Sequence, residues 1–389
     1  MIAESLVKTI FDDLKRKDPE TVLAAFTDNE ARDTMRYLIR ENHGIVVDTE
    51  EKVEYLIQEM VGLGVIETIT KNDENITDIT YNGRHLVIES SDKAEPYIYT
   101  DKLIDDDYIV SLASKVANVT EKEFTPKTDV LEASIGYLRF TFVHKSRSNG
   151  IAGKVTTMAI RVSRPKLSLN DDNFIEFAPL KMKDYFKNAV KQRKNIIIGG
   201  ETGSGKTALQ KYLVSFFDFR DKAIWIEDVA EGHLDVLFGD SKDIFSWQTG
   251  PNTSMTKLIK TALRFNPTWI CPTEARGGEA NEIMDAVLSD HGVISTCHTP
   301  GIKELPRRWI NMMKKEYTFD EQAMLEDIYN NFGVAVHVKK GVINGKNVRY
   351  LSEVGSYNPD GSVNYIFKQR LVNGKLEYKI YDQLEPITI

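Results

Sequence analysis

A glycine-rich loop between an apolar run and a helical pattern places the strongest constraint on the fold of this chain. The run NIIIGGETGSGKTALQKYL fits the spacing G-x-x-x-x-G-K-[ST]. Glycines let backbone N–H groups curl around a phosphate, and the N-terminus of the following helix adds partial positive charge. We therefore expect a strand, a loop and a helix that bind a nucleoside triphosphate. The predicted nucleotide-binding residues are Gly200, Glu201, Thr202, Gly203, Ser204, Gly205, Lys206 and Thr207.

Apolar runs alternate with helical patterns after this loop. The strand-like segments are KAIWIED, TWICPT, GVISTCHT and GVAVHVKK, and segments with helical periodicity separate them. Such alternation is typical of a parallel sheet covered by helices on both faces. We predict an α/β nucleotide-binding domain over residues 179–340. The turn sequences INGKN, NPDGS and VNGKL predict a β-rich extension over residues 341–389.

The first part of the chain predicts a separate α+β domain over residues 1–165. A length of 389 residues is long for one core. EKVEYLIQEMVGLG has helical periodicity, and ITDITYNGRHLVIE alternates around Asn82-Gly83, which predicts a hairpin with a two-residue turn. IGYLRFTFVHKS and TTMAIRVSRP predict strands, and Pro165 ends the second. The polar stretch after it predicts a linker over residues 166–178.

Polar side chains with catalytic chemistry follow three of the predicted strands. Glu227 and Asp228 end the first, Glu274 ends the second, and His298 ends the third, with His291 just before it. The carboxyl ends of parallel strands meet at one edge of a sheet, where ligands bind. A carboxylate there can hold Mg²⁺ through water or orient an attacking water. A histidine at the same edge can contact a terminal phosphate.

Composition narrows the function and the compartment. The two cysteines lie in apolar runs and form no C-x-x-C pair, which argues against a four-cysteine zinc site. The net charge of −8 does not favour direct binding of nucleic acid. No apolar run reaches the roughly 20 residues that span a bilayer, and the N-terminus does not resemble a signal peptide. We expect a cytoplasmic protein that meets the cytoplasmic side of the membrane through partners.

The order of the motifs resembles that of a known superfamily. GETGSGKT, IEDVAE, LRFNPTWICPTEARGGEA and DHGVISTCHT are similar to the Walker A loop, Asp box, Walker B segment and His box of the secretion ATPases. These serve type II and type IV secretion and pilus assembly. GLGVIETITKNDENITDITYNG resembles the start of their N-terminal domain. The resemblance covers roughly residues 60–340 and is greatest to the traffic ATPases of type IV secretion and conjugation. It implies a RecA-like P-loop NTPase motor domain and a homohexameric ring.

The resemblance also implies roles for the motif residues. Lys206 and Thr207 would bind phosphate and Mg²⁺, so the implied cofactors are ATP and Mg²⁺, with Thr207 and Glu274 at the metal. Glu227 and Glu274 would serve the metal and the activation of water. His298 matches the His-box position.

Arginines of the N-terminal domain reach the γ-phosphate in this family. Arg139 in YLRFTF and Arg161 in MAIRVSRP match them, and Arg164 is a weaker candidate. Arg264 and Arg276 flank the Walker B strand as family arginines do. A guanidinium suits this task because its planar fork pairs with phosphate oxygens.

The implied function is ATP hydrolysis that powers substrate transfer or apparatus assembly in a type IV secretion (conjugation) system. The implied partners are further copies of the chain, inner-membrane secretion or pilus proteins, and a coupling protein. A Tad-type pilus assembly ATPase and a DNA-translocating ring ATPase are alternatives. Thr268 and Thr273 depart from the family pattern around the Walker B strand, as do Asp290 in the His box and Ala208 after the loop. Thr268 and Thr273 leave open a third alternative, a ring that binds ATP for assembly and hardly hydrolyses it.

Overall fold

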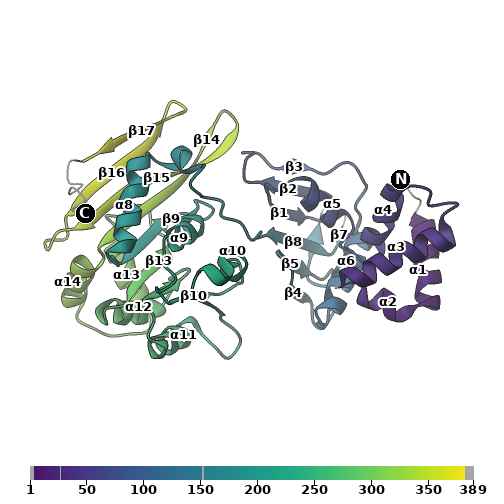
Figure 1. Cartoon of the computed structure of the whole chain (residues 1–389), viewed down its shortest axis with the longest axis horizontal. Helices are drawn as coiled ribbons and strands as arrows, with labels where there is room; N and C mark the ends of the chain where they lie inside the picture. Colours follow the sequence, from purple (N-terminus) through teal and green to yellow (C-terminus); the bar gives the residue numbers. More distant parts are fainter. Residues whose placement is uncertain (1–3, 27, 151–152, 382–389) are drawn as a thin grey trace. The chain divides into compact units, whose positions relative to one another are not determined.

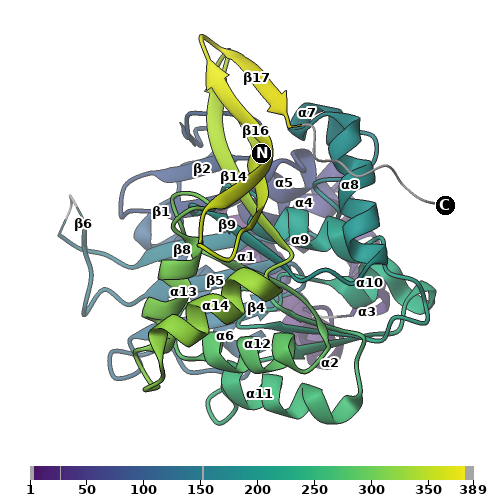
Figure 2. The same cartoon turned by 90° about the vertical axis from the view of Figure 1, so that its left-hand side faces the viewer.

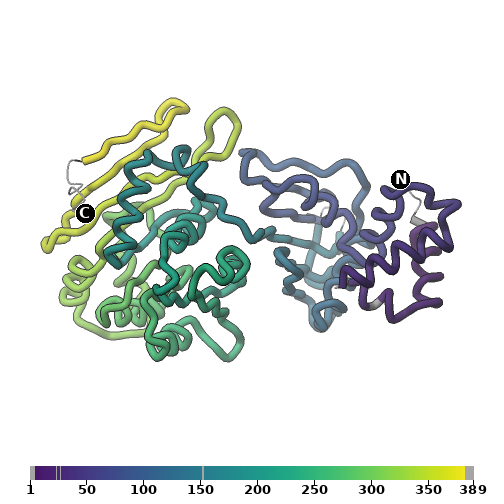
Figure 3. The backbone as a smooth tube through the Cα atoms, in the orientation of Figure 1, coloured from purple at the N-terminus to yellow at the C-terminus, as the bar shows by residue number. Residues whose placement is uncertain are grey.

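The chain folds into two compact units, each contiguous in sequence. The computed structural model describes residues 4–26, 28–150 and 153–381. The units are Met1–Ser163, purple to blue in Figures 1 and 3, and Arg164–Ile389, teal to yellow. This division lies next to the boundary expected at residue 165. The finer domain limits and the linker stay predictions.

Helices at the start of the N-terminal unit pack around their own apolar core. Asp28 accepts a hydrogen bond from the N–H of Glu30 and caps α3, while Thr49 caps α4 by accepting from Lys52. Met35 and Leu56 are fully buried where these helices meet. The helices of the unit are α1 (Glu4–Lys17), α2 (Pro19–Ala24), α3 (Asn29–His43), α4 (Glu50–Met60), α5 (Val65–Asn72) and α6 (Asp106–Val119).

An antiparallel sheet forms the second half of this unit. Within the described residues its six strands have the order β3-β2-β1-β8-β5-β4, and apolar residues of α5 and α6 join its core. Alternate residues of β5 are buried, so Arg139 lies on the face opposite the core. The strands are β1 (Ile76–Tyr81), β2 (Leu86–Ser90), β3 (Tyr97–Ile98), β4 (Val130–Ile135), β5 (Leu138–Val143) and β8 (Thr157–Val162); β6 (Asn149–Gly150) pairs with β7 (Gly153–Lys154).

The predicted hairpin is confirmed, but its turn is longer than expected. Tyr81 pairs with Leu86, which leaves the four residues 82–85 in the loop. The Asn82 side chain accepts hydrogen bonds from the N–H groups of Arg84 and His85. An asparagine that bonds to its own loop in this way stabilises a wider turn, and only Gly83 adopts positive φ. The prediction of a two-residue turn was wrong for this reason.

The second unit is built on a mixed sheet whose parallel part matches the predicted α/β pattern. Its nine strands, counted over the described residues, have the order β11-β10-β12-β13-β9-β14-β15-β16-β17. The pairs from β11 to β14 are all parallel. The parallel strands are β9 (Ile196–Gly200), β10 (Ala223–Glu227), β11 (Ile244–Gln248), β12 (Trp269–Pro272), β13 (Gly292–Cys297) and β14 (Val334–Ile343).

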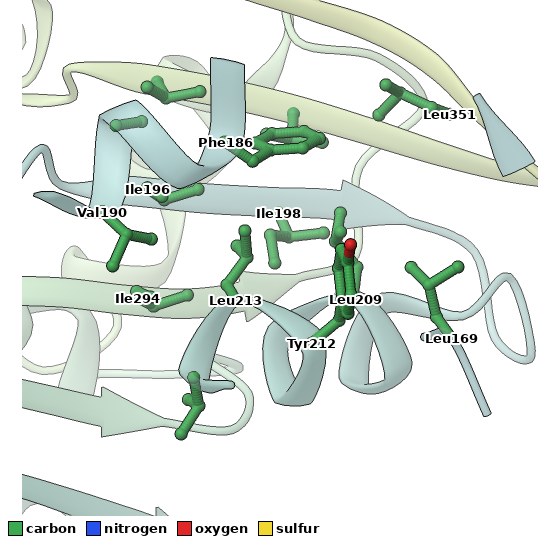
Figure 4. Close-up of a cluster of buried hydrophobic side chains, with 14 of the residues drawn as sticks. Leu169, Phe186, Val190, Ile196, Ile198, Leu209, Tyr212, Leu213, Ile294 and Leu351 are labelled. Atoms are coloured by element: carbon green, nitrogen blue, oxygen red, sulfur yellow. The ribbon is translucent and has the colours of Figure 1, made fainter. Parts of the chain in front are cut away.

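Helices cover both faces of this sheet. In Figure 4, Phe186 and Val190 of α8 and Leu209 and Leu213 of α9 lie against Ile198 and its neighbours on β9. Apolar residues of α11 to α14 form a second cluster with Ile197 and Ile270 on the other face. The helices are α7 (Phe174–Phe177), α8 (Leu180–Lys191), α9 (Lys206–Val214), α10 (Leu234–Phe238), α11 (Met255–Ala262), α12 (Glu279–Leu288), α13 (Leu305–Met313) and α14 (Glu321–Asn331), with 3₁₀ turns at Gly239–Ser241 and Leu263–Phe265.

The antiparallel tail extends the same sheet. β14 pairs in parallel with β9 on one side and antiparallel with β15 on the other. The predicted turns fall at the ends of β15 (Lys346–Tyr357), β16 (Val363–Val372) and β17 (Lys375–Ile380), which pair in that order. Figure 2 shows β16 and β17 side by side. The tail is thereby connected through β14 to β9, the strand that leads into the glycine-rich loop.

Candidate functional site

The glycine-rich loop runs from the end of β9 to the start of α9, as the sequence predicts. Gly203 and Gly205 have φ of +73° and +97°, a region that favours glycine. A Cβ on Gly200 would lie 2.6 Å from the carbonyl oxygen of Val338, so crowding also requires glycine there. A Cβ on Gly203 would meet nothing within 4 Å, so the loop is open on that side. These features form a backbone cradle at a helix N-terminus, which suits phosphate.

Lys206 lies inside this loop rather than in solvent. Its side chain belongs to a residue only 7% exposed, and Nζ donates hydrogen bonds to the carbonyls of Gly200 (3.1 Å) and Glu201 (3.0 Å). Burial lowers the pKa of Lys206, although the nearby Glu274 opposes that change. A buried ammonium whose closest partners are neutral carbonyls gains strongly from an arriving anion. Thr207 follows in the first turn of α9 and is partly exposed.

Lys206, His298 and Glu274 form a line at the carboxyl edge of the sheet. The Nζ of Lys206 lies 3.4 Å from Nδ1 of His298, and Nε2 of the same ring lies 2.8 Å from Oε1 of Glu274. Three strands therefore deliver the predicted loop, His-box and Walker B residues to one place. His291 is not part of it, because it precedes β13 at the opposite edge, where Nδ1 contacts the carbonyl of Pro267 at 2.9 Å.

Glu274 is surrounded by cationic groups. Burial alone would raise its pKa, but Arg276, His298 and Lys206 outweigh burial and hold the pKa below its usual value. Nη2 of Arg276 donates to Oε2 at 2.8 Å. Glu274 is therefore ionised at neutral pH. Ionisation suits a group that accepts a proton from water or holds a metal-bound water.

The two acids at the end of β10 have different surroundings. Glu227 is 6% exposed, and its Oε2 accepts hydrogen bonds from the N–H groups of Glu231 (3.1 Å) and Gly232 (2.8 Å). Burial raises the pKa of Glu227. Asp228 instead lies 3.4 Å from Nη1 of Arg276, which also contacts Glu274. The structure thus places Asp228, rather than Glu227, beside the guanidinium that contacts Glu274. The catalytic role expected of Glu227 stays a prediction.

The acids at this edge fit a magnesium ion. Mg²⁺ is usually held by one or two carboxylates together with waters and substrate phosphates. Oε1 of Glu274 is buried and lies 2.8 Å from Nε2 of His298, while Oε2 and Asp228 both contact the Arg276 guanidinium. No group of three or more metal-ligating side chains occurs in the described part of the chain. Thr207 and Glu274, the predicted ligands, would therefore depend on phosphate oxygens to complete the set.

The two predicted N-terminal arginines are direct neighbours. Arg139 of β5 is paired in register with Arg161 of β8, and Arg161 is paired in register with Asp78 of β1. Nε of Arg161 donates to Oδ1 of Asp78 at 3.2 Å. Like charges directly opposite one another are destabilising, and the Asp78 carboxylate offsets part of that repulsion. Both arginines belong to the first unit, while Arg164 begins the second.

One residue at the loop was missed by sequence reasoning. Nε of Arg349, on β15, donates a 2.9 Å hydrogen bond to the carbonyl of Gly203. The side chain also lies 3.3 Å from where a Cβ of Gly205 would be. No motif marks Arg349, because the contact joins positions 146 residues apart and arises from the pairing of β15 with β14.

The departures from the family pattern leave these groups in place. The carbonyl of Thr273 accepts a hydrogen bond from Oγ1 of Thr296, which fixes the residue before Glu274. Thr268 donates its N–H to the carbonyl of Lys222 at the start of β10.

No helix in the described part of the chain is long and apolar enough to cross a membrane.

Comparison with known proteins places these features in a wider group. The family model for type II/IV secretion system proteins matches residues 151–373. An uncharacterized protein of Bacillus anthracis is 41% identical over 387 residues, which is 96% of this chain and 86% of the relative. The type IV secretion system protein VirB11 of Brucella suis is 34% identical over 189 residues, 45% of this chain and half of the relative's length.

A solved structure supports the fold. The ATPase DotB of Legionella pneumophila superposes with a TM-score of 0.56 at 18% identity, over 76% of this chain and 82% of that one. At that identity the likeness concerns the fold alone, and it agrees with the expected RecA-like architecture.

Proposed function

We propose, from the premise that this chain belongs to the type II/IV secretion system protein family, that it is a homohexameric ATPase of a type IV secretion (conjugation) system. Its hydrolysis of ATP powers substrate transfer or apparatus assembly on the cytoplasmic side of the membrane. The partners are other copies of the chain, inner-membrane secretion proteins and a coupling protein. The observation that carries the proposal is the line of Lys206, His298 and Glu274 beside the glycine-rich loop.

Each group in this line has a task in the proposed reaction. The loop binds the phosphates through backbone N–H groups and Lys206, and Thr207 and Glu274 hold Mg²⁺. Bound Mg²⁺ neutralises charge that develops on the phosphate oxygens. Glu274, ionised beside its cationic neighbours, orients the attacking water. His298 lies between the Lys206 ammonium and the Glu274 carboxylate. Its ring contacts the terminal phosphate and so couples the presence of that phosphate to both neighbours.

The N-terminal arginines add a second hold on the terminal phosphate. Arg139 and Arg161 stand opposite one another across two strands, a spacing that suits one multivalent anion. Hydrolysis removes that anion, so the arginines would favour the triphosphate state over the diphosphate state. Such differential affinity is what a nucleotide-driven motion requires.

Purified protein tests the proposal directly. We expect phosphate release from ATP that stops when EDTA removes Mg²⁺, together with a six-membered assembly by mass photometry in the presence of a non-hydrolysable ATP analogue. Nucleotide binding without phosphate release would favour the ring that hardly hydrolyses ATP. Rates that rise with added DNA and fall steeply with salt would favour the DNA translocase. Genes for a relaxase and a coupling protein beside this gene would support conjugation, whereas prepilin genes would support a pilus motor.

A further inference from the structure

Arg276 connects the two acids that a divalent metal would use. Nη2 contacts Oε2 of Glu274 at 2.8 Å, and Nη1 contacts Oδ2 of Asp228 at 3.4 Å. These acids follow different strands, β12 and β10. One guanidinium therefore neutralises the pair from the position between them. Its side chain is 61% exposed, so it can leave without disturbing the core.

The backbone of Arg276 is anchored independently of this side chain. Its N–H donates to Oε1 of Glu279 at 2.6 Å, and the N–H of Gly277 donates to the same oxygen. Its carbonyl accepts a hydrogen bond from Nζ of Lys315 at 2.8 Å. The loop is therefore held by main-chain contacts. A change confined to the guanidinium should leave the two acids in place.

The charges around the pair explain why a second cation would be excluded. Glu274 already faces His298 at 2.8 Å and the charge of Lys206 beyond it. Asp228 accepts a hydrogen bond from Oγ1 of Thr249 and otherwise faces Arg276. With the guanidinium present, free Mg²⁺ would meet acids that are already neutralised. A bound triphosphate would add negative charge beside the acids and so favour binding of Mg²⁺ over the Arg276 guanidinium.

We propose that Arg276 is a built-in counter-ion that competes with Mg²⁺ for Glu274 and Asp228. The nucleotide-free site then excludes free Mg²⁺, and the metal enters with the triphosphate when the guanidinium is displaced. This inference rests on the proposed function, because it takes the metal of the bound nucleotide as the competitor. Metal and nucleotide are thereby coupled, each raising the affinity for the other.

Titration of nucleotide-free protein with Mn²⁺, followed by the loss of the free-ion EPR signal, tests this coupling. We expect Arg276→Gln to bind Mn²⁺ about tenfold more tightly than the wild type, since one unit charge beside the acids is gone. Arg220→Gln is the matched control: Arg220 pairs with exposed Asp218 before the start of β10, at the opposite edge of the sheet, and should leave Mn²⁺ affinity unchanged. Arg276→Gln combined with Glu274→Gln should lose the gain.

A second variant keeps the test open if Arg276→Gln does not fold. Arg276→Lys keeps the charge but loses the planar fork, so its Mn²⁺ affinity should fall between those of the wild type and the neutral variant. Equal Mn²⁺ affinity in the wild type and in every folded Arg276 variant would overturn the inference. A fluorescent ATP analogue, measured in parallel with Mg²⁺ present, separates the two proposals. Failure of all variants and of the wild type to bind it would count against the proposed function instead.

Discussion

The two units carry their functional charges in different ways. In the second unit, Lys206, His298, Glu274 and Arg276 contact one another in a chain, so each charge has an opposite or a polar neighbour. In the first unit, two arginines stand in register on adjacent strands of one sheet face. The first arrangement joins opposite charges in one site, whereas the second sets two like charges beside one carboxylate, Asp78. We propose that the second unit does the chemistry and that the arginines of the first add positive charge to it.

Removing the ammonium from the loop is the strongest way to break the self-contained site. We expect Lys206→Ala to reduce nucleotide affinity and phosphate release by about a hundredfold or more, because a buried, charge-assisted contact to phosphate is lost. Fluorescent-nucleotide binding and phosphate release measure the two effects. Lys187→Ala, which removes the same charge from an exposed position on α8, is the control. Full activity of Lys206→Ala would remove the loop from the mechanism.

Neutralising Glu274 separates binding from chemistry. We expect Glu274→Gln to slow phosphate release by about 10²–10³-fold, the usual loss when a positioned base is removed, with nucleotide affinity changed by less than about threefold. Single-turnover kinetics with saturating ATP check the first number, and equilibrium binding checks the second. A large loss of affinity with an unchanged rate would make Glu274 a metal-binding group only.

The N-terminal arginines test the other half of the comparison. We expect Arg139→Ala and Arg161→Ala each to slow phosphate release by about tenfold or more, because cationic groups at the transferred phosphate stabilise its developing charge. The double variant should lose little beyond either single one, since two groups that act on one phosphate are not additive. Arg84→Ala, exposed in the hairpin loop of the same unit, is the control. Additive losses would mean that the two arginines act at separate places.

The sequence predicts the parallel α/β core and the residues of its carboxyl edge, because each strand and its polar end are encoded locally. Periodicity places Glu274 and His298 after their strands, and the parallel order of those strands brings both residues to one edge of the sheet. The sequence could not predict that Arg276 contacts Asp228, or that Arg349 contacts Gly203, since these contacts depend on the register of distant strands. The four-residue turn at Asn82 was missed for a different reason. Its side-chain hydrogen bonds compete with the short turn that the dipeptide favours.

Among the substitutions, Glu227→Gln is expected to have the smallest effect on phosphate release, and it compares Glu227 at the end of β10 with Glu274 after β12. Its buried carboxylate accepts two backbone N–H groups of its own loop, whereas Glu274 is ringed by cations. An amide oxygen in Glu227→Gln can accept the same hydrogen bonds. We therefore expect phosphate release to fall by less than about tenfold, against the larger loss in Glu274→Gln. A loss as large as that of Glu274→Gln would make Glu227 a catalytic residue, as the family resemblance implies.

The pH dependence of stability tests the same assignment without ATP. Burial raises the pKa of Glu227 in the folded protein, so the folded state holds its proton more tightly than the unfolded state does. The resulting stability is present at low pH and is lost as pH rises through the unfolded and then the folded pKa. Melting curves at pH 5 and pH 8 should show Glu227→Gln gaining on the wild type at the higher pH. Glu227→Ala should instead be destabilised at both by about 2 kcal/mol, because two buried N–H groups lose their acceptor. A constant difference between wild type and Glu227→Gln would mean that folding leaves the pKa of Glu227 unchanged, and a loss by Glu227→Gln at the higher pH would mean that the anion is stabilised, as it is in Glu274.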